Sequence, residues 1–431
     1  MTTALATKPI DYDNIVLSGD QQTALDGIYN FLLDPDERVF VLEGYSGCGK
    51  STLVRTFLDR LPSVLKMEKL VNKDMIDYEV MLTASTNKAA ETLAQMSGQE
   101  CRTIHSALGL RLFTDYSTGK TSLSPKNADI LERKFLVIDE FSFIDSELLN
   151  HIFTRTRNCK VLFVGDPAQL SPVKSSKVPV IEAGFAGAKL REVMRQPKGD
   201  DPSWVHPITA LGAQFRHTVE TGEWLPFKPD GVHIIHLERD AFNEAIKTEF
   251  TRPEWNYRDS TVLGYTNKRV IQYNQFVSRL ASGHPNLQVG DYAICNSFVA
   301  ANKVSFKTDE MVHITGISHD YEEAGVMGKE FTLNGKALMF MPNSLADKNA
   351  RLKVAKAQKD WSLVQRIEQQ WVDLRASFAR TVNKAQGSTH ARVFMDLDDI
   401  ASCTNGDTIA RLMYVGVTRA QHQVFMTGDF A

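Results

Sequence analysis

The chain has 431 residues, of which 43% are hydrophobic and 23% charged, and its net charge is −3. This composition is typical of a globular protein with an ordinary core, and the length predicts two or more domains. We find no run approaching the roughly 18 apolar residues of a membrane span, and residues 1–14 lack the apolar core of a signal peptide. The five cysteines form no C-x-x-C pair, which argues against a zinc site and a disulfide framework. We therefore expect a cytoplasmic protein with reduced cysteines and a loose N-terminal tail over residues 1–14.

Short β-branched or aromatic runs alternate with helical patterns through the first part of the chain. We expect four of them to form buried parallel strands, each ending at a polar or glycine-containing loop: Val39–Leu42, Val80–Thr83, Phe135–Ile138 and Val161–Val164. Such a pattern predicts an α/β nucleotide-binding domain, with its site formed by loops at the carboxyl ends of the strands.

A glycine-rich loop follows the first of these runs, with the sequence Gly44-Tyr45-Ser46-Gly47-Cys48-Gly49-Lys50-Ser51. This G-x-x-x-x-G-K-[ST] pattern lies between a strand and a helix, the context in which it binds the phosphates of a nucleoside triphosphate. The glycines let backbone N–H groups turn toward the β-phosphate, Lys50 places a charge against the β/γ-oxygens, and the Ser51 hydroxyl can ligate Mg²⁺. The loop identifies the ligand but not the use made of its energy.

Two more of the predicted strands end in polar residues suited to the same ligand. Phe135–Ile138 leads to Asp139, which we interpret as a Mg²⁺ ligand, and to Glu140, which is placed to polarise the attacking water. Val161–Val164 leads to the loop Gly165–Gln169, where Gln169 could reach the γ-phosphate or its attacking water. The predicted cofactors are ATP and Mg²⁺.

A second strand set predicts a second α/β unit, formed by Gly231–Leu237, Thr261–Tyr265 and Val393–Met395. It is interrupted from about Gln288 to Leu338 by a pattern of short strands and turns that includes the Asn334-Gly335 hairpin signal. The expected strands of this small all-β insert are Asp291–Cys295, Met311–Ile317, Glu330–Leu333 and Ala337–Met341. The segment Ala346–Arg380 predicts helix, either one long arm or a helical hairpin. Its tryptophans, Trp361 and Trp371, are more typical of packing against the insert than of base stacking.

The ordered motifs of the chain resemble those of superfamily 1 helicases. The resemblance rests on Gly44–Ser51, Asp139–Ser142, Gly165–Val173 and Tyr414–Ala420, and it extends to Leu17–Gln22, Thr83–Ala90, Thr103–Ser106 and Thr381–Ser388. Only 32 residues separate Ser106 from Asp139, which leaves room for a short β-hairpin around Leu110–Ser124 and matches the RecD-like branch. Three positions depart from the family pattern, since Ser85, Asn383 and Gly416 stand where relatives often have Pro, His and Ala.

The resemblance implies an α/β fold with two RecA-like parallel-sheet domains, a β-hairpin insert in the first, and an SH3-like β insert with a helical arm in the second. The first core domain would span 15–106 and 127–195, with the hairpin at 107–126. The second would span 196–285 and 376–431, with the SH3-like insert and arm at 286–375. The hairpin would act as the pin that separates strands, and its apolar candidates are Leu112, Phe113, Tyr116 and Leu123, which could equally form a small hairpin core.

The same resemblance assigns site residues. Arg195 and Arg419 would reach the γ-phosphate from across the cleft as arginine fingers, alongside Lys50, Asp139, Glu140 and Gln169 as the catalytic set. Mg²⁺ would be held by Ser51 and Asp139. The nucleotide would contact Gln21, Gly44, Gly47, Cys48, Gly49, Lys50, Ser51, Thr52 and Gly387, with Gln21 reading adenine. The DNA strand would contact Thr86, Asn87, Lys88, Thr103, His105, Tyr265, Thr266, Asn267, Lys268 and Thr381, although threonine and asparagine could equally cap helices.

The implied activity is an ATP-dependent DNA helicase that moves 5′ to 3′ on single-stranded DNA and separates duplexes. The alternative is a translocating ATPase that strips or loads proteins without processive unwinding. A P-loop kinase of small molecules would leave Tyr414–Ala420 and the Gln169 loop unexplained. Expected partners are single-stranded and forked or tailed duplex DNA, with a single-strand binding protein or replication proteins as further candidates. We expect a monomer, located in the bacterial host cytoplasm if the protein is phage-encoded. The net charge of −3 still permits binding through a few phosphates.

Overall fold

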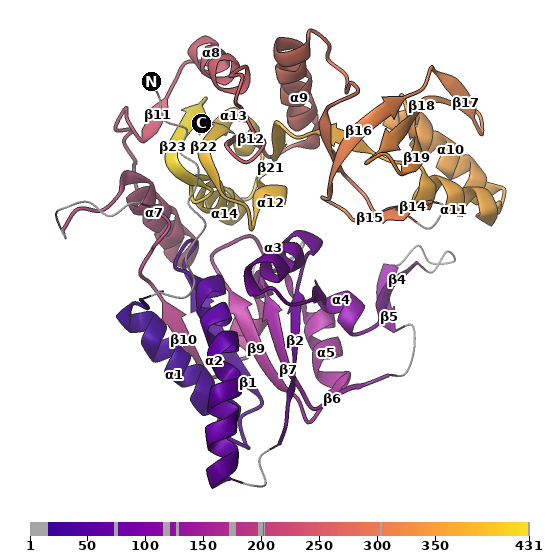
Figure 1. The fold of residues 1–431 in the computed structure, drawn as a ribbon. Coiled ribbons are helices and arrows are strands. Elements are labelled where there is room, and N and C mark those ends of the chain that lie inside the picture. Colours follow the sequence, from indigo (N-terminus) through magenta and orange to yellow (C-terminus); the bar gives the residue numbers. More distant parts are fainter. Residues whose placement is uncertain are drawn as a thin grey trace.

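Two α/β domains and a β-rich insert make up the chain in this computed structural model (Figure 1). The structure describes residues 16–72, 76–114, 121–125, 129–171, 178–196, 201, 203–301 and 304–429. The predicted tail over 1–14 lies outside these residues, as do Pro172 and Val173 of the third motif. No helix in the described ranges combines the length and the apolar character needed to cross a bilayer.

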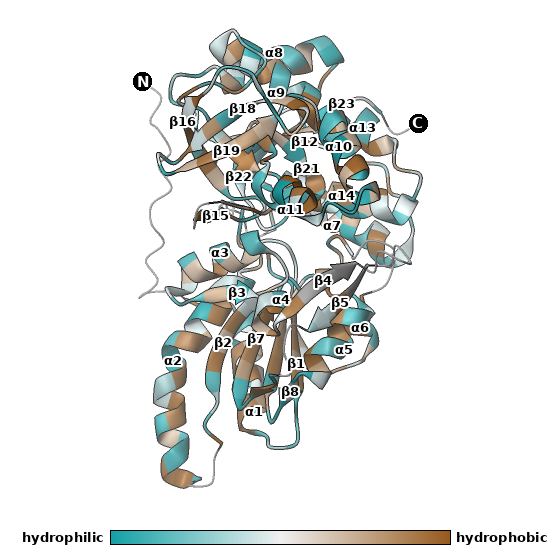
Figure 2. Ribbon diagram, turned by 90° about the vertical axis from the view of Figure 1, so that its right-hand side faces the viewer, coloured by the Kyte–Doolittle hydropathy of each residue, from teal (hydrophilic) through white to brown (hydrophobic). Residues whose placement is uncertain are grey.

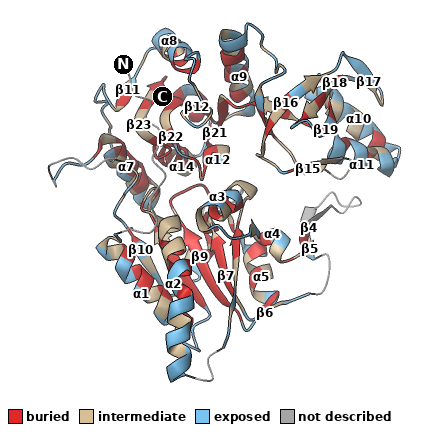
Figure 3. Cartoon of the chain, viewed as in Figure 1, coloured by how far each residue is buried: buried red, intermediate tan, exposed pale blue. Residues whose placement is uncertain are grey.

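The first domain is built on a six-stranded sheet in the order β10-β1-β9-β7-β2-β3, with every neighbouring pair parallel. Its strands are β1 (Val39–Gly44), β2 (Glu79–Ala84), β3 (Cys101–Thr103), β7 (Lys134–Asp139), β9 (Lys160–Gly165) and β10 (Gly187–Leu190). The central strands β7 and β9 are buried along most of their length because helices cover both faces of the sheet (Figure 3). The four strands expected in this part of the sequence are confirmed.

Helices, a 3₁₀ turn and two short strand pairs complete this domain. The helices are α1 (Gly19–Leu33), α2 (Lys50–Val71), α3 (Asn87–Ser97), α4 (Ile104–Ala107), α5 (Ser146–Thr154) and α6 (Pro179–Glu182), with a 3₁₀ turn over Phe141–Phe143. Beside the main sheet, β4 (Leu110–Thr114) pairs with β5 (Thr121–Pro125) as an antiparallel hairpin, and β6 (Leu131–Glu132) pairs with β8 (Thr156–Arg157). Of the four candidate pin residues, Leu123 packs against the core of the domain. Tyr116 and the side chains of Leu112 and Phe113 lie outside the described residues.

The second domain has a five-stranded parallel sheet in the order β11-β23-β22-β12-β21. Its strands are β11 (Ile234–His236), β12 (Ser260–Gly264), β21 (Ala379–Thr381), β22 (His390–Asp396) and β23 (Ala420–Thr427). Its helices are α7 (Pro207–Thr221), α8 (Arg239–Phe250), α9 (Asn267–Ser282), α12 (Val382–Ala385), α13 (Leu397–Ala401) and α14 (Gly406–Val417). The hydrophobic residues concentrate on the strands of both sheets and on the helix faces that cover them (Figure 2). The predicted pair of RecA-like domains is confirmed.

The insert between α9 and β21 is an antiparallel β-structure, as the sequence predicts. Its strands are β13 (Tyr292–Cys295), β14 (Val299–Ala301), β15 (Val304–Phe306), β16 (Met311–Ile317), β17 (Tyr321–Glu323), β18 (Val326–Leu333), β19 (Ala337–Pro342) and β20 (Leu374–Ala376). Asn334 and Gly335 join β18 to β19 with φ of 53° and 66°, the left-handed pair that an Asn-Gly hairpin turn requires.

The expected helix over Ala346–Arg380 is correct only in its first two thirds. Helices α10 (Leu345–Ala357) and α11 (Trp361–Gln370) form a helical hairpin, but the chain then becomes the strands β20 and β21. Val372, Leu374 and Ala376 are buried at alternate positions, which is the period of a strand rather than a helix. Trp371 is fully buried and packs against Phe340, whereas Trp361 is 46% exposed.

Candidate functional site

The phosphate loop connects β1 to α2 at the carboxyl edge of the first sheet. Gly47 and Gly49 have φ of 83° and 79°, so both occupy the left-handed region that other residues avoid. A Cβ at Gly49 would lie 2.5 Å from Nε2 of Gln21, and one at Gly47 would lie 2.7 Å from Cβ of Arg195. The glycines therefore allow neighbouring side chains to approach the loop backbone closely.

Two side chains hold the loop from within its own domain. Lys50 donates from Nζ to the backbone oxygens of Gly44 at 2.7 Å and Tyr45 at 3.0 Å. Gln21 donates from Nε2 to the oxygen of Cys48 at 3.0 Å, and its Oε1 accepts from the N–H of Ser18. The Gln21 amide thus braces the loop with its nitrogen and the start of α1 with its oxygen, and its contact with adenine stays a prediction. Ser51 and Thr52, at the start of α2, are half-buried beside the loop.

Asp139 and Glu140 lie at the carboxyl end of β7, and β9 separates this strand from β1, which leads into the phosphate loop. Burial, and then the neighbouring charge of Glu140, raise the pKa of Asp139 to about 7. Glu140 has a φ of 57°, a left-handed conformation that is uncommon for this residue type. A buried carboxylate with an acidic neighbour fits a divalent cation, and the oxygen ligands of Asp139 and Ser51 are of the kind that Mg²⁺ prefers.

Arg195 and Arg419 converge on one atom of the phosphate loop. Arg419 donates from Nη2 to Oγ of Ser46 at 2.6 Å, and Arg195 donates from Nη1 to the same Oγ at 3.2 Å. Arg419 follows α14 of the second domain, and Arg195 lies on the segment that leaves β10. Burial, and then the charge of Arg419, lower the pKa of Arg195 to about 9. The structure therefore brings both predicted arginine fingers to the loop.

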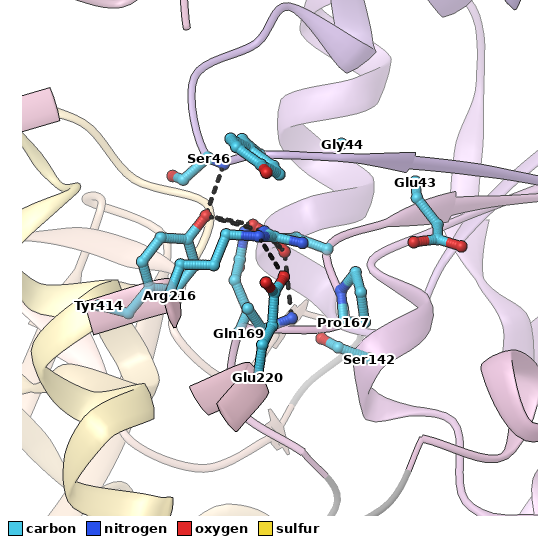
Figure 4. A network of polar contacts seen from close by, with 12 residues as sticks. Glu43, Gly44, Ser46, Ser142, Pro167, Gln169, Arg216, Glu220 and Tyr414 are labelled. Atoms are coloured by element: carbon cyan, nitrogen blue, oxygen red, sulfur yellow. Dashed lines mark hydrogen bonds and ion pairs between the residues drawn. The ribbon is translucent and has the colours of Figure 1, made fainter. Parts of the chain in front are cut away.

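A buried polar network joins the two core domains beside these arginines (Figure 4). Arg216 of α7 pairs with Asp166 at 2.5 Å, and Tyr414 of α14 donates to the other oxygen of Asp166 at 2.6 Å. The N–H of Ser46 donates to the Tyr414 hydroxyl at 2.9 Å, and the guanidinium of Arg216 lies 3.9 Å from the ring centre of Tyr45. Arg216 has no sequence motif around it, and its role could not be found from the sequence.

Two glutamines complete the cleft between the domains. Gln386 of the second domain donates from Nε2 to Oε2 of Glu140 and to Oγ of Ser142, both at 3.3 Å. The neighbouring Gly387 has a φ of 77°, and a Cβ at this position would lie 3.9 Å from Oε1 of Glu140. Gln169 is 3% exposed, its backbone oxygen accepts from Arg411 at 2.8 Å, and its Oε1 has no partner within the described part of the chain.

The predicted strand-binding residues include four threonines, and each of them caps a helix. Their hydroxyls accept from backbone N–H groups as follows: Thr86 from Ala89 in α3, Thr103 from Ser106 in α4, Thr266 from Arg269 in α9, and Thr381 from Lys384 in α12. The capping alternative is therefore correct for all four, because each hydroxyl supplies an acceptor that the first helical turn lacks. Their contact with DNA stays a prediction.

A cavity of about 380 Å³ between α3, the second sheet and the insert brings together Lys88, Asn267 and Thr381. Asn267 accepts from Arg375 at 2.7 Å. The other predicted strand contacts do not line this cavity: Thr86, Asn87, Thr103, His105, Tyr265, Thr266 and Lys268. Tyr265 packs against the core of the second domain, and burial lowers the pKa of the half-buried His105. The cavity also contains Arg258, Arg380 and His390, which sequence reasoning missed because they belong to no motif in the predicted set.

Comparisons with known proteins show similarity to DNA helicases. Residues 16–214 match the family described as "AAA domain", and residues 376–427 match "UvrD-like helicase C-terminal domain". The chain is 22% identical to the ATP-dependent DNA helicase Dda of Enterobacteria phage T4, over 89% of this chain and 93% of that protein. It is 30% identical to the ATP-dependent RecD2 DNA helicase of Deinococcus radiodurans, over 42% of this chain but only 22% of that protein.

A solved structure supports the fold. The Pif1 helicase from Bacteroides, in complex with ADP-AlF3 and single-stranded DNA, superposes with a TM-score of 0.52 at 14% identity, covering 97% of this chain and 94% of that one. Together with the order of the motifs, the family models and the relatives support a helicase of the RecD-like branch of superfamily 1.

Proposed function

We propose that this chain is an ATP-dependent DNA helicase that moves 5′ to 3′ along single-stranded DNA and separates duplex DNA. The observation that carries the proposal is the approach of Arg195 and Arg419 to Ser46 of the phosphate loop. Two guanidinium groups held at a phosphate-binding loop, one of them from the second domain, suit the stabilisation of charge on a transferred phosphoryl group. Binding of the γ-phosphate by these arginines would close the cleft, and its release would open the cleft.

The hydrolytic step falls to residues on both sides of the cleft. Glu140 would accept a proton from the attacking water, and Gln386 orients its carboxylate from the second domain by a hydrogen bond. Lys50 would transfer its hydrogen bonds from the loop carbonyls to phosphate oxygens. Ser51 and Asp139 would hold Mg²⁺, which supplies neutralisation of phosphate charge when bound. Gln169, buried beside Arg411 of α14, would report the state of the γ-phosphate to the second domain.

Stepping would follow from closure of the cleft. The cavity that contains Lys88 and Thr381 has walls from both core domains, so a strand bound there would be held by each in turn. Contacts to phosphates and sugars position a strand without reading its sequence, as a translocating enzyme requires. Melting a base-pair step costs on the order of 0.6–2.2 kcal/mol, which is well within the free energy of ATP hydrolysis.

The experiment that tests the proposal compares duplexes with a 5′ or a 3′ single-stranded tail. We expect ATPase activity stimulated by single-stranded DNA, and unwinding of the 5′-tailed duplex only. Absence of stimulation would refute both motor functions. Stimulation without unwinding of either duplex would favour the alternative, an ATPase that strips or loads proteins on single strands. Unwinding of the 3′-tailed duplex alone would reverse the polarity.

We further propose that the protein acts as a monomer and that it is located in the cytoplasm. It would cooperate with a single-strand binding protein or with replication proteins. Sedimentation of the protein with and without a DNA oligonucleotide checks that it acts as a monomer. A single species of one chain per oligonucleotide is the expected result.

A further inference from the structure

Arg380 is a buried arginine in the groove between the two core domains, and no residue in the described chain pairs with it. It lies in the middle of β21 and is 6% exposed. Its Nε has no hydrogen-bond partner within the described residues, and none of the ion pairs found there includes it. A buried guanidinium without an acceptor costs free energy, so such a group indicates a missing anion.

The surroundings of Arg380 carry excess positive charge. Five cationic residues line the cavity, Lys88, Arg258, Arg375, Arg380 and Lys384, against three acidic ones, Glu91, Asp309 and Glu310. Asp309 pairs with Lys384 at 2.9 Å, and Arg375 pairs with Asp373 at 3.3 Å. None of the ion pairs among the described residues includes Lys88, Arg258 or Arg380, although Glu91 and Asp309 attract the charge of Lys88 and Asp309 attracts that of Arg380.

Burial disfavours the charged forms of Lys88 and Arg380, and Arg380 also repels Lys88. Burial, and then the charge of Arg380, lower the pKa of Lys88, and burial lowers the pKa of Arg380. His390 also lines the cavity, but its Nδ1 lies 3.2 Å from the backbone oxygen of Arg258 and burial lowers its pKa, so its unpartnered Nε2 is an acceptor and would not bind an anion. The groups suited to an anion are therefore the guanidinium of Arg380 and the half-buried ammonium of Lys88.

Lys88 and Arg380 belong to different domains. Lys88 lies in the first turn of α3, and Arg380 lies in the second sheet, so the cavity is a seam between domains rather than a pocket in one of them. Figure 1 shows α3 facing the part of the second domain that carries β21 and α12. A single anion bound there would bridge the two domains and remove the repulsion across the seam.

We propose that Arg380, with Lys88 on the opposite side of the seam, binds one backbone phosphate of the single-stranded nucleic acid on which the protein moves. This inference rests on the proposed function, because it takes the groove to hold that strand. Arginine suits the task since its fork of donors matches phosphate oxygens. The bound phosphate would hold the strand to both domains at the point where closure of the cleft brings them together.

The test measures binding of a fluorescent oligothymidylate by the wild type and by Arg380→Met at several salt concentrations. Each phosphate contact on a single strand contributes about 0.7 to the slope of log K against log salt concentration, so the slope should fall by about that amount. The affinity should fall roughly ten- to a hundredfold, as for the loss of a hydrogen bond to a charged group. Arg392→Met is the matched control, because Arg392 lies in the same sheet but is paired with Glu249 and Gln423 outside the groove. It should leave the slope unchanged.

A scan of neutral methylphosphonate linkages along the oligonucleotide identifies the phosphate itself. In the wild type one linkage should weaken binding more than its neighbours, and in Arg380→Met that penalty should disappear. Arg380→Lys should restore most of the slope. Circular dichroism checks folding, and if Arg380→Met does not fold, Lys88→Met gives the same two measurements from the other side of the seam.

An unchanged slope together with a persisting methylphosphonate penalty in both Arg380→Met and Lys88→Met would overturn the inference. This failure is distinct from that of the proposed function, in which the wild type itself would show neither binding of the oligonucleotide nor stimulation of its ATPase.

Discussion

Arg419 and Ser46 are joined by a hydrogen bond of 2.6 Å between Nη2 and Oγ, across the boundary between the two core domains. Arg195 donates to the same hydroxyl oxygen and to the backbone oxygen of Thr418. Arg419 also donates to the backbone oxygens of Val415 and Ser388, so Ser46 is one of several neutral acceptors around the two arginines. A phosphate with several charged oxygens would be a stronger acceptor for both guanidinium groups than the Ser46 hydroxyl.

The contact gives a first prediction about turnover. Arg419→Met should reduce kcat by about 10³- to 10⁵-fold, the range found when an arginine finger is lost. Ser46→Ala should keep most of the wild-type kcat, because the hydroxyl is replaced as the partner of the arginines once nucleotide binds. Steady-state ATPase measurements with saturating single-stranded DNA compare the two variants. Equal losses in both would show that Ser46 itself takes part in hydrolysis.

A second prediction separates hydrolysis from strand binding. Lys50→Ala removes the charge held against the phosphates, and Glu140→Gln removes the base that Gln386 orients. Both variants should lose ATPase activity and retain binding of single-stranded DNA, because neither residue lines the cavity between α3 and the second sheet. Filter binding and phosphate release measure the two properties. Retained turnover in Glu140→Gln would show that another group acts as the base.

A third prediction concerns the buried ion pair between Arg216 and Asp166. Their side chains are 6% and 0% exposed, so removal of one partner leaves a buried charge without compensation. Arg216→Met should destabilise the protein by about 3–5 kcal/mol, the usual cost of breaking such a pair. The double variant Arg216→Met with Asp166→Asn should recover much of that loss, because no uncompensated charge remains. Thermal unfolding of both variants provides the comparison, and additive losses would contradict the coupling.

The sequence located the phosphate loop, whereas it did not locate the residues that join the two domains. The glycine and lysine spacing of Gly44–Ser51 reflects a local requirement of the loop, so it is visible in a short stretch of sequence. Arg216 meets Asp166, Tyr45 and Tyr414 only after the chain has folded, since it is 171 residues from Tyr45 and 198 from Tyr414. No local pattern marks a residue whose partners are all distant.

The strands beyond residue 370 show a second limit of sequence reasoning. The composition of Ala346–Arg380 favours helix throughout, but Leu374 and Ala376 pair with β13 of the insert. Tertiary pairing therefore decided the structure against local propensity. The same misassignment hid Arg380, which in a helical arm would have been one more exposed cation. The four capping threonines show the converse, since a residue type suited to DNA contact is also suited to the start of a helix.

A fourth prediction concerns the hairpin formed by β4 and β5. Replacing residues 111–124 by a short glycine-serine turn removes a hairpin whose two strands, among the described residues, pair with each other and with no further strand. Unwinding of a 5′-tailed duplex should be lost, while ATPase stimulated by single-stranded DNA should remain, because the nucleotide site and the groove are untouched. Strand-displacement and ATPase assays test the two activities. A variant that still unwinds would show that another element separates the strands.

The last prediction concerns stability at low pH and the cap of α7. His206 is 6% exposed, its Nδ1 accepts from the N–H of Ile208, and its ring centre lies 4.6 Å from that of His233. Burial, followed by the charges of His233 and His422, lowers the pKa of His206 to about 4, whereas an unfolded histidine titrates near 6.5. The unfolded chain then binds a proton more readily than the folded one. Stability is therefore complete above about pH 6.5 and decreases as the pH falls toward 4.

The substitution His206→Asn separates this titration from the capping role, because asparagine is a good cap without a charge in this range. The variant should lose less thermal stability than the wild type between pH 7 and pH 4.5, as measured by the melting temperature at a series of pH values. His217→Asn is the control, since His217 is an exposed histidine on the same helix. If the wild type and His206→Asn lost stability in parallel, the acid sensitivity would have to come from other groups, and the neutral His206 cap would contribute nothing to it.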